Sequence, residues 1–421
     1  MPPKPAPAAA VKAPVAFETE VAEFNEFGTA TQVIAIPHRK LGEKVETKGY
    51  VNEFWTAKQR AASSLQEISY RACFKPQLPR FFIERLTRPG EVVYDPFMGR
   101  GTTLIEAALM GRIPFGCDIN PLSQVLVRGR LNPPTLEQVK RRLAEINLDD
   151  PADEPEDLQV FFHPATLRQI SSLKHYFITR RAQGALDQVD EWLCLVALNR
   201  LTGHSPGFFS VYTLPPNQAT SVVAQRKINA KRNQTPPNRD VRPILLKKSK
   251  NLLGDCDAHV RATLAKVAPQ ARLVTSRSAA TPELPDGSVA LVVTSPPFMA
   301  VVDYAGDNWL RCWFLGIDAK TVKITMARKL EEWAAEMTAV MAELHRVLRP
   351  GGHVAFEVGE VAQGSIRLEE SVLPCGLAAG LEPRFVLINA QEFTKTANCW
   401  GVDNNDKGTN TNRIVVFRKP G

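Results

Sequence analysis

The segment at residues 91–118 constrains the fold more than any other part of the chain. A short, apolar, β-prone run ends in Asp95 and leads into a turn with Gly99 and Gly101, which opens a helical pattern. A second strand-like run then ends in Asp118. Strand, glycine turn, helix and strand in this order form the opening unit of a doubly wound domain, so we expect an α/β fold with a Rossmann-like sheet.

The alternation of predicted strands and helices is interrupted and later resumes. Helical spacing recurs across residues 56–86, and further helices are expected at residues 136–146, 165–181, 186–201 and 321–348. Strands are expected at residues 271–275, 288–294, 353–358, 384–388 and 413–418. We therefore predict a disordered, Pro- and Ala-rich tail at residues 1–16, a first α/β part at 17–130, a mostly helical insertion at 131–270 and a second α/β part at 271–421.

Positive charge is concentrated in the insertion. The chain has 52 Lys and Arg against 44 Asp and Glu, a net charge of +8, and residues 219–251 alone hold nine basic residues and one acid. Such a stretch is either a solvated face or a surface for a polyanion. We expect phosphate contacts from Arg226, Lys227, Lys231 and Arg232. The amide side chains able to pair with base edges are Asn217, Gln218, Gln225, Asn229, Asn233 and Gln234.

Composition excludes several classes of protein. No apolar run approaches the roughly 18 residues of a membrane span, and the start of the chain lacks the apolar core of a secretory signal. The seven cysteines are scattered without a CxxC pair, so neither a zinc site nor a disulfide framework is indicated. We expect a cytoplasmic protein without a metal ion or a membrane partner.

The first glycine turn is suited to a nucleotide-like cofactor. Gly99 and Gly101 allow the backbone to approach a ligand, and the Asp95 carboxylate can accept hydrogen bonds from an amine or a hydroxyl group. Leu104 stands where a nicotinamide dinucleotide site has its third glycine, which argues against that cofactor. Asp118, at the end of the next strand, is placed to accept hydrogen bonds from both hydroxyls of a ribose.

A second motif, Ser295–Pro296–Pro297–Phe298, follows the apolar strand at residues 288–294. Two prolines remove two amide donors and fix the backbone, which leaves carbonyl oxygens free to accept from an amino group. A rigid acceptor beside an aromatic ring suits a planar base with an exocyclic amine. The alternative is a Pro-Pro turn with a core Phe.

Together, DPFMGRGTT, GCDINP and LPDGSVALVVTSPPF resemble the amino-methyltransferases that use S-adenosylmethionine, in particular the DNA N4-cytosine and N6-adenine methylases. The resemblance covers residues 75–120 and 273–419. In this family a Ser at the first position of the second motif is typical of cytosine-N4 enzymes, so Ser295 implies transfer to N4 of cytosine in double-stranded DNA. It further implies a flipped target base, a target-recognition insertion and a role in restriction-modification, and it allows a cognate restriction endonuclease as a partner.

The resemblance also assigns residues. Those implied to hold the cofactor are Asp95, Phe97, Gly99, Gly101, Thr102, Thr103, Asp118 and Ile119. The catalytic set is Ser295, Pro296, Pro297 and Phe298: the hydroxyl of Ser295 bonds the cytosine, the Pro296 carbonyl orients the amine, and Phe298 stacks on the ring. Pro374–Cys375 matches the nucleophile of C5-cytosine methylases, but amine methylation needs no covalent intermediate, so we interpret Cys375 as a buried structural residue.

Rival functions remain at this stage. The same chemistry on adenine N6 is the nearest, and an RNA amino-methyltransferase is the second. A catalytically degenerate nucleic-acid-binding protein is the third, because Arg100 stands where the family often has a small Ser and Ser278 where it often has an acid.

Overall fold

The computed structural model describes residues 16–40, 42–56, 62–71, 73–149, 154–214, 219–297, 304–322, 327, 329–361, 366–390 and 411–421. The predicted tail, apart from Ala16, and Phe298 of the second motif lie outside these residues.

The strands form one large sheet. They are β1 (Gln32–Lys40), β2 (Glu43–Asn52), β3 (Val92–Asp95), β4 (Ile113–Asp118), β5 (Arg272–Thr275), β6 (Val289–Thr294), β7 (Leu348–Val358), β10 (Glu382–Ala390) and β11 (Thr411–Arg418). Within the described residues their order is β1-β2-β10-β11-β7-β6-β3-β4-β5. The short β8 (Glu360–Val361) and β9 (Ile366–Arg367) pair separately.

The strand order reverses beside β3. From β3 the chain proceeds to β4 and β5 on one side, and from β6 to β7 on the other, and these neighbours are parallel. Antiparallel β11 lies between β7 and β10. This doubly wound arrangement confirms the predicted α/β fold. In such sheets ligands bind outside the carboxyl ends of the strands at the reversal point, which here is the edge where β3 and β6 end.

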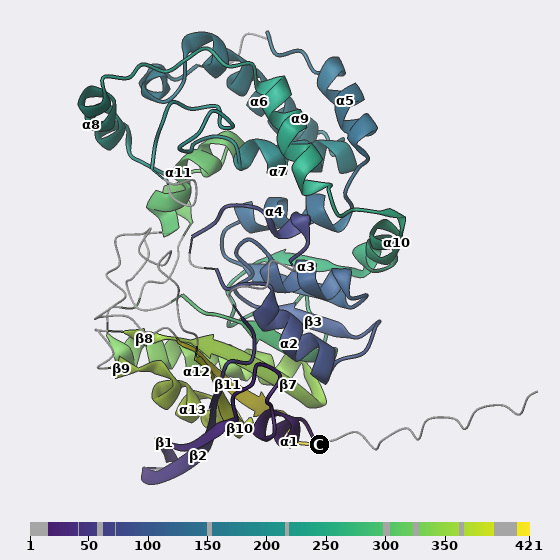
Figure 1. Ribbon diagram of the computed structural model, residues 1–421, viewed down its shortest axis with the longest axis vertical. Coiled ribbons are helices and arrows are strands. Elements are labelled where there is room, and N and C mark those ends of the chain that lie inside the picture. Colours follow the sequence, from purple (N-terminus) through teal and green to yellow (C-terminus); the bar gives the residue numbers. More distant parts are fainter. Residues whose placement is uncertain are drawn as a thin grey trace, which may run out of the picture.

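Helices cover both faces of the sheet (Figure 1). They are α1 (Phe17–Ala22), α2 (Gln77–Leu86), α3 (Thr102–Leu109), α4 (Leu122–Leu131), α5 (Leu136–Glu145), α6 (Pro164–Ala182), α7 (Gln188–Leu198), α8 (Val222–Arg232), α9 (Val241–Leu252), α10 (Ala258–Val267), α11 (Tyr304–Leu315), α12 (Leu330–Val347) and α13 (Leu368–Ala378). The side chains of α1 and α2 pack on one face, and those of α12 and α13 on the other.

The helical region between β4 and β5 packs directly on the α/β part. Buried Leu104 of α3 and Leu126 of α4 belong to the same apolar cluster as Trp192 of α7 and Leu245 of α9. The three helices predicted in the insertion are confirmed as α5, α6 and α7, whereas α8, α9 and α10 were not predicted because their cations hide the apolar spacing. The division at residues 130 and 270 remains a prediction.

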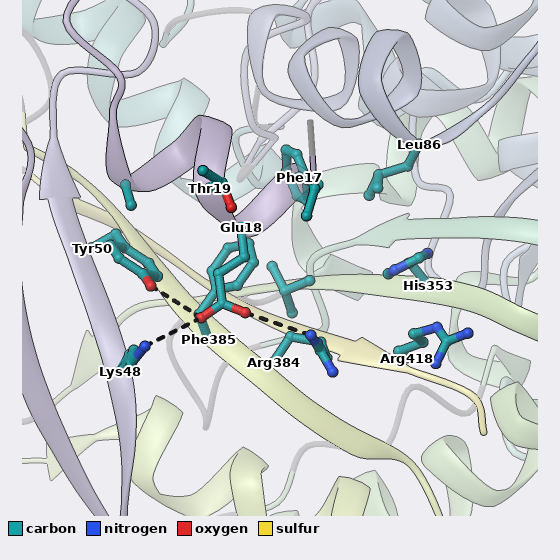
Figure 2. Close-up of a pocket in the computed structure, with 13 residues that line it drawn as sticks. Phe17, Glu18, Thr19, Lys48, Tyr50, Leu86, His353, Arg384, Phe385 and Arg418 are labelled. Atoms are coloured by element: carbon teal, nitrogen blue, oxygen red, sulfur yellow. Dashed lines mark hydrogen bonds and ion pairs between the residues drawn. The ribbon is translucent and has the colours of Figure 1, made fainter. Parts of the chain in front are cut away.

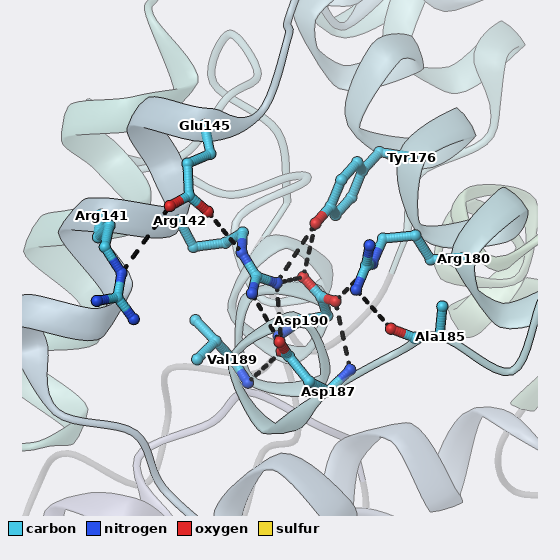
Figure 3. A network of polar contacts seen from close by, with 9 residues as sticks. All are labelled: Arg141, Arg142, Glu145, Tyr176, Arg180, Ala185, Asp187, Val189 and Asp190. Carbon is cyan, nitrogen blue, oxygen red and sulfur yellow. Dashed lines mark hydrogen bonds and ion pairs between the residues drawn. The ribbon is translucent and has the colours of Figure 1, made fainter.

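A buried carboxylate joins three helices of this region (Figure 3). Asp190 of α7 is fully buried, and it accepts hydrogen bonds from Arg180 Nε at 2.8 Å and Tyr176 Oη at 2.9 Å, both on α6. Arg142 of α5 donates to the same carboxylate and to Asp187. A buried charge is tolerated only when it is paired in this way, so the cluster fixes how α5, α6 and α7 meet.

Three local predictions were wrong. Across the described residues 62–71 and 73–86, only α2 and a single 3-10 turn at Ser64–Gln66 are helical, and the Leu65 and Ile68 carbonyls accept from Arg130 and Arg100. The helix predicted from residue 321 begins at Leu330. The strand predicted at residues 353–358 begins earlier: β7 starts at Leu348 and includes Gly351, which has a φ of +74°.

Candidate active site

The first glycine turn has a backbone that only glycine adopts easily. Gly99 and Gly101 have φ values of +46° and +78°. A Cβ added at Gly101 would lie 2.3 Å from Val127 Cγ2 of α4. The turn is therefore held tightly against α4, and its open side faces the edge where β3 ends.

Asp118 closes this turn from β4. Its Oδ2 accepts a hydrogen bond from the Gly99 amide at 2.9 Å, and its Oδ1 accepts one from the Asn120 amide at 2.8 Å. Burial raises the pKa of this carboxyl group, while the two amide bonds act in the opposite direction. Each carboxylate oxygen retains lone pairs for a second donor, so the predicted contact with ribose hydroxyls fits this geometry. Ile119 follows directly and is half-buried.

Asp95 connects the two predicted motifs. This carboxylate is 2% exposed, and its Oδ1 accepts from the Thr294 hydroxyl at 2.6 Å and from the Phe97 amide at 3.0 Å. Burial raises its pKa to about 7; the hydrogen bonds from Thr294 and Phe97 oppose this, and the charge of Asp118 adds to it. Thr294 immediately precedes Ser295, so the structure brings both motifs to one point of the sheet.

The remaining cofactor candidates support the turn. Thr103 of α3 donates to the Val293 carbonyl of β6 at 3.1 Å, which ties the turn to the strand of the second motif. The Thr102 carbonyl accepts from Gln66 at 3.1 Å. Phe97 is half-buried at the edge of an apolar cluster. Thr102 and Thr103 therefore hold the helix that follows the glycines.

The sequence analysis missed an acid beside the second motif. Glu357, near the end of β7, is 9% exposed and accepts a hydrogen bond from Asn412 Nδ2 at 2.6 Å; it lies beside Ser295, because the preceding residues Phe356 and Thr294 are partners in the sheet. Burial raises the pKa of this carboxyl group, against the effect of the neighbouring Ser295 and Asn412 side chains. An acid in an otherwise apolar strand end was a signal that could have found it. Ser295 thus lies next to a buried carboxyl group.

The two departures from the family pattern have structural explanations. Arg100 turns away from the glycine turn: its guanidinium donates to the Ile68 carbonyl at 2.8 Å and to Thr102 Oγ1 at 3.0 Å. Ser278 donates to the Pro96 carbonyl at 2.6 Å and thus braces the first motif. The two side chains thus bond to acceptors within the first motif, the Thr102 hydroxyl and the Pro96 carbonyl.

The predicted phosphate contacts lie together on α8. Arg226, Lys227, Lys231 and Arg232 are all exposed. Arg226 pairs with Asp157 at 2.8 Å, and the guanidinium of Arg232 lies 3.8 Å from the centre of the Tyr212 ring.

Three of the six amide candidates for base reading make hydrogen bonds within the fold. Asn229 donates to the Val160 carbonyl at 2.7 Å, and Gln225 and Gln234 donate to the Tyr212 carbonyl at 3.0 and 2.9 Å. Asn233 ends α8 with a φ of +46°, a conformation in which Asn is common. Gln225, Asn229 and Gln234 are therefore engaged within the fold, and base reading by these amides remains a prediction. Asn217 and Gln218 lie outside the described residues.

Other candidate sites lie elsewhere or do not form. Cys375 is buried inside α13, as predicted, and burial raises the pKa of its thiol. In the part of the chain that the structure describes, no three His, Cys, Asp or Glu side chains gather as metal ligands would. No helix of the described residues is long and apolar enough to cross a membrane.

One pocket lies away from the motifs (Figure 2). It has a volume of about 640 Å³ and is bounded by α1 and the sheet, where Glu18 accepts from Tyr50 and pairs with Arg384 at 3.5 Å. Arg384 stands near the start of β10 and Arg418 at the end of antiparallel β11. The pocket therefore opens at the opposite edge from Asp95 and Ser295.

The fold and the site define a class. The structure places a glycine turn and two strand-end acids beside a Ser-Pro-Pro segment, at the point where the strand order of a doubly wound sheet reverses. Such an arrangement is a site for a nucleotide-like cofactor next to a second substrate.

Comparisons with known proteins agree with this class. Residues 20–124, which include the first motif and Asp118, match the family model described as DNA methylase. Type II methyltransferase M.MjaII of Methanocaldococcus jannaschii is 34% identical over 77 residues, 18% of this chain and 14% of that protein. M.MvaI of Kocuria varians is 27% identical over 156 residues, 36% and 31% of the two chains. M.BsoBI of Geobacillus stearothermophilus is 20% identical over 337 residues, 73% and 64%.

These matches support the amino-methyltransferase family for this chain. The chain spans less than two thirds of the length of each of the three relatives.

Proposed function

We propose that the chain is an S-adenosylmethionine-dependent DNA methyltransferase that methylates N4 of cytosine at specific sites. The observation that carries the proposal is the 2.6 Å hydrogen bond from Thr294 to Asp95, because it brings the glycine turn and the Ser-Pro-Pro segment together where a parallel sheet binds ligands. The family match and the relatives named type II methyltransferase support the DNA substrate.

The residues present fit the cofactor. The turn at Gly99 and Gly101 follows the carboxyl end of β3, Asp95 offers a carboxylate to an ammonium group, and Asp118 offers one to a ribose. When bound, S-adenosylmethionine supplies an electrophilic methyl group.

On the base side, Ser295 and the Pro296 carbonyl would orient a flipped cytosine so that its amine points toward the methyl group. Glu357, beside Ser295 in the sheet, is proposed to accept from the serine hydroxyl and so to set its direction. Phe298 is proposed to stack on the base. Residues 131–270 are proposed to hold the target-recognition region, with the exposed cations of α8 on DNA phosphates.

The test is direct identification of the product. Purified protein is incubated with unmethylated duplex DNA and isotopically labelled S-adenosylmethionine, and the digested nucleosides are separated by mass spectrometry. We expect N4-methylcytosine, and a large loss of it in Ser295→Ala with cofactor binding retained. Labelled N6-methyladenine would contradict the choice of base, label in RNA alone would contradict the substrate, and no transfer despite cofactor binding would favour a binding protein.

A further inference from the structure

Helix α8 presents one face to its own protein and the other to solvent. Gln225 is fully buried and, with Asn229, anchors the helix to the Tyr212 and Val160 carbonyls. The exposed residues on the opposite side recur at helical spacing and form what we call the α8 outer face: Val223, Arg226, Lys227, Ala230 and Lys231. The helix is therefore fixed in orientation while this face remains open.

The α8 outer face combines positive charge with an apolar side chain. The helix carries four cations and no acid, and among the described residues Lys227 and Lys231 have no ion pair. Val223 is 61% exposed, and Tyr212 and Leu214 just before it are 36% and 39% exposed. A polyanion fits this charge better than a protein partner does. Phosphates would meet the lysines, while an apolar base edge such as the methyl group of thymine would meet the valine.

The start of α8 is joined to the candidate active site. The Ala219 amide donates to the Asp307 carbonyl at 3.1 Å, and Trp309 Nε1 donates to the Thr220 carbonyl at 3.3 Å, so the residues before α8 are bonded to α11. Helix α11 is the next helix after the Ser-Pro-Pro segment. In Figure 1, α8 and the β8–β9 pair that follows the end of β7 lie on the same side of the molecule.

Helix α11 also reaches the glycine turn. Its Arg311 guanidinium lies 5.7 Å from the centre of the Tyr70 ring, and a Cβ at Gly99 would lie 3.5 Å from Tyr70 Cε1. Contacts thus run from the first motif through Tyr70 and α11 to the start of α8, the end that carries Val223.

We propose that α8 is a recognition helix that enters the major groove beside the target base, with Val223 in contact with a base edge. The inference rests on the proposed function and names the element that reads the sequence. The helix has 11 residues and a length of about 16 Å, and the major groove, about 12 Å wide, admits an α-helix. Lys227 and Lys231, about one and two turns further along the same face, then bind phosphates.

The test compares two valines of equal exposure. Val223→Ala is paired with Val33→Ala, because Val33 of β1 is 60% exposed and lies in the strand at the far end of the sheet order. Parent and variants select sequences from a randomised duplex pool, and methylated positions are then sequenced. We expect Val223→Ala to lose preference at one base pair by about ten-fold, while Val33→Ala selects as the parent does. Lys227→Ala should weaken binding to all sequences alike and reduce the salt slope by about 0.9.

The outcomes separate the two proposals. If the parent protein selects a defined sequence but transfers no methyl group, the proposed function is wrong. The effect of Val223→Ala on one base pair can still be measured in that case, because the selected DNA pool reports sequence preference without methylation. Methyl transfer with an unchanged sequence preference in a folded Val223→Ala protein would overturn the recognition helix. So would an equal loss of affinity for every sequence in that variant, or a parent protein that binds no duplex and instead self-associates through this face.

Discussion

Lowering the pH from 8 to 6 should weaken the binding of S-adenosylmethionine by about ten-fold, because Asp95 loses its charge in this interval. Burial raises the pKa of Asp95 to about 7, even though Thr294 and Phe97 donate hydrogen bonds to its carboxylate. A cofactor ammonium group would be attracted to the ionised form. Affinity should therefore increase as the pH rises through 7.

The magnitude follows from the ionised fraction. With a pKa of about 7, roughly nine tenths of the Asp95 carboxyl groups are ionised at pH 8 and about one tenth at pH 6. Titration calorimetry at constant ionic strength gives the dissociation constant at each pH. The matched control is Asp95→Asn, which keeps the shape and an acceptor oxygen but cannot titrate, so any pH dependence that it retains belongs to other groups.

The same carboxyl group should affect stability in the opposite direction. Its pKa is higher in the folded protein than the ordinary 3.8, so the unfolded chain loses this proton first as the pH rises. Between about pH 4 and pH 7 the free energy of unfolding should fall by about 4 kcal/mol on account of Asp95 alone, and Asp95→Asn should lack this fall. Identical pH dependence of cofactor affinity in the parent and in Asp95→Asn would refute the placement of Asp95 at the cofactor.

Three further substitutions test other parts of the site. Asp118→Ala should weaken cofactor binding by roughly ten- to a hundred-fold. It should also lower the melting temperature, because the Gly99 amide loses its acceptor. Unchanged affinity in the folded variant would mean that Asp118 does not touch the cofactor. Ser295→Ala should slow methylation of DNA, while its affinity for the cofactor, measured by calorimetry, should equal that of the parent protein. A methylation rate equal to the parent's would show that Ser295 is not part of the base pocket. Asn229→Ala should reduce the free energy of unfolding by about 1 to 3 kcal/mol, as measured by chemical denaturation, because its bond to the Val160 carbonyl is lost. The methylated sequence should stay unaltered. A new recognition sequence in this variant would show that the amide reads a base.

The motifs could be placed from the sequence because each directly follows an apolar strand. The carboxyl ends of parallel strands share one edge of a sheet, so Asp95, Asp118 and Ser295 had to lie near one another once the doubly wound order was expected. The same reasoning predicted β5, β6, β10 and β11 to within a few residues. These features depend on local pattern and on topology.

Other parts depend on contacts that no local pattern reveals. Glu357 reaches Ser295 only because β7 lies beside β6, and a single acid in an apolar strand gives a weak signal. An amide side chain that could pair with a base has the same chemistry as one that donates to a backbone carbonyl. The role of Asn229 could therefore not be assigned from the sequence without knowing that the Val160 carbonyl lies beside it. In α9, Leu245 and Leu252 are buried, but the three lysines between them obscured the spacing.

The packing of the helical region explains how sequence reading would be coupled to chemistry. Trp192 of α7 is fully buried and donates to Ser249 of α9 at 3.0 Å, within the apolar cluster that also contains Leu126 of α4. Arg130, also on α4, donates to the Arg100 carbonyl in the glycine turn and to the Leu65 carbonyl. A region joined through a shared core moves with the sheet, unlike a domain on a linker. Docking of α8 on DNA would therefore fix the position of the duplex relative to Asp95 and Ser295 without a further hinge movement.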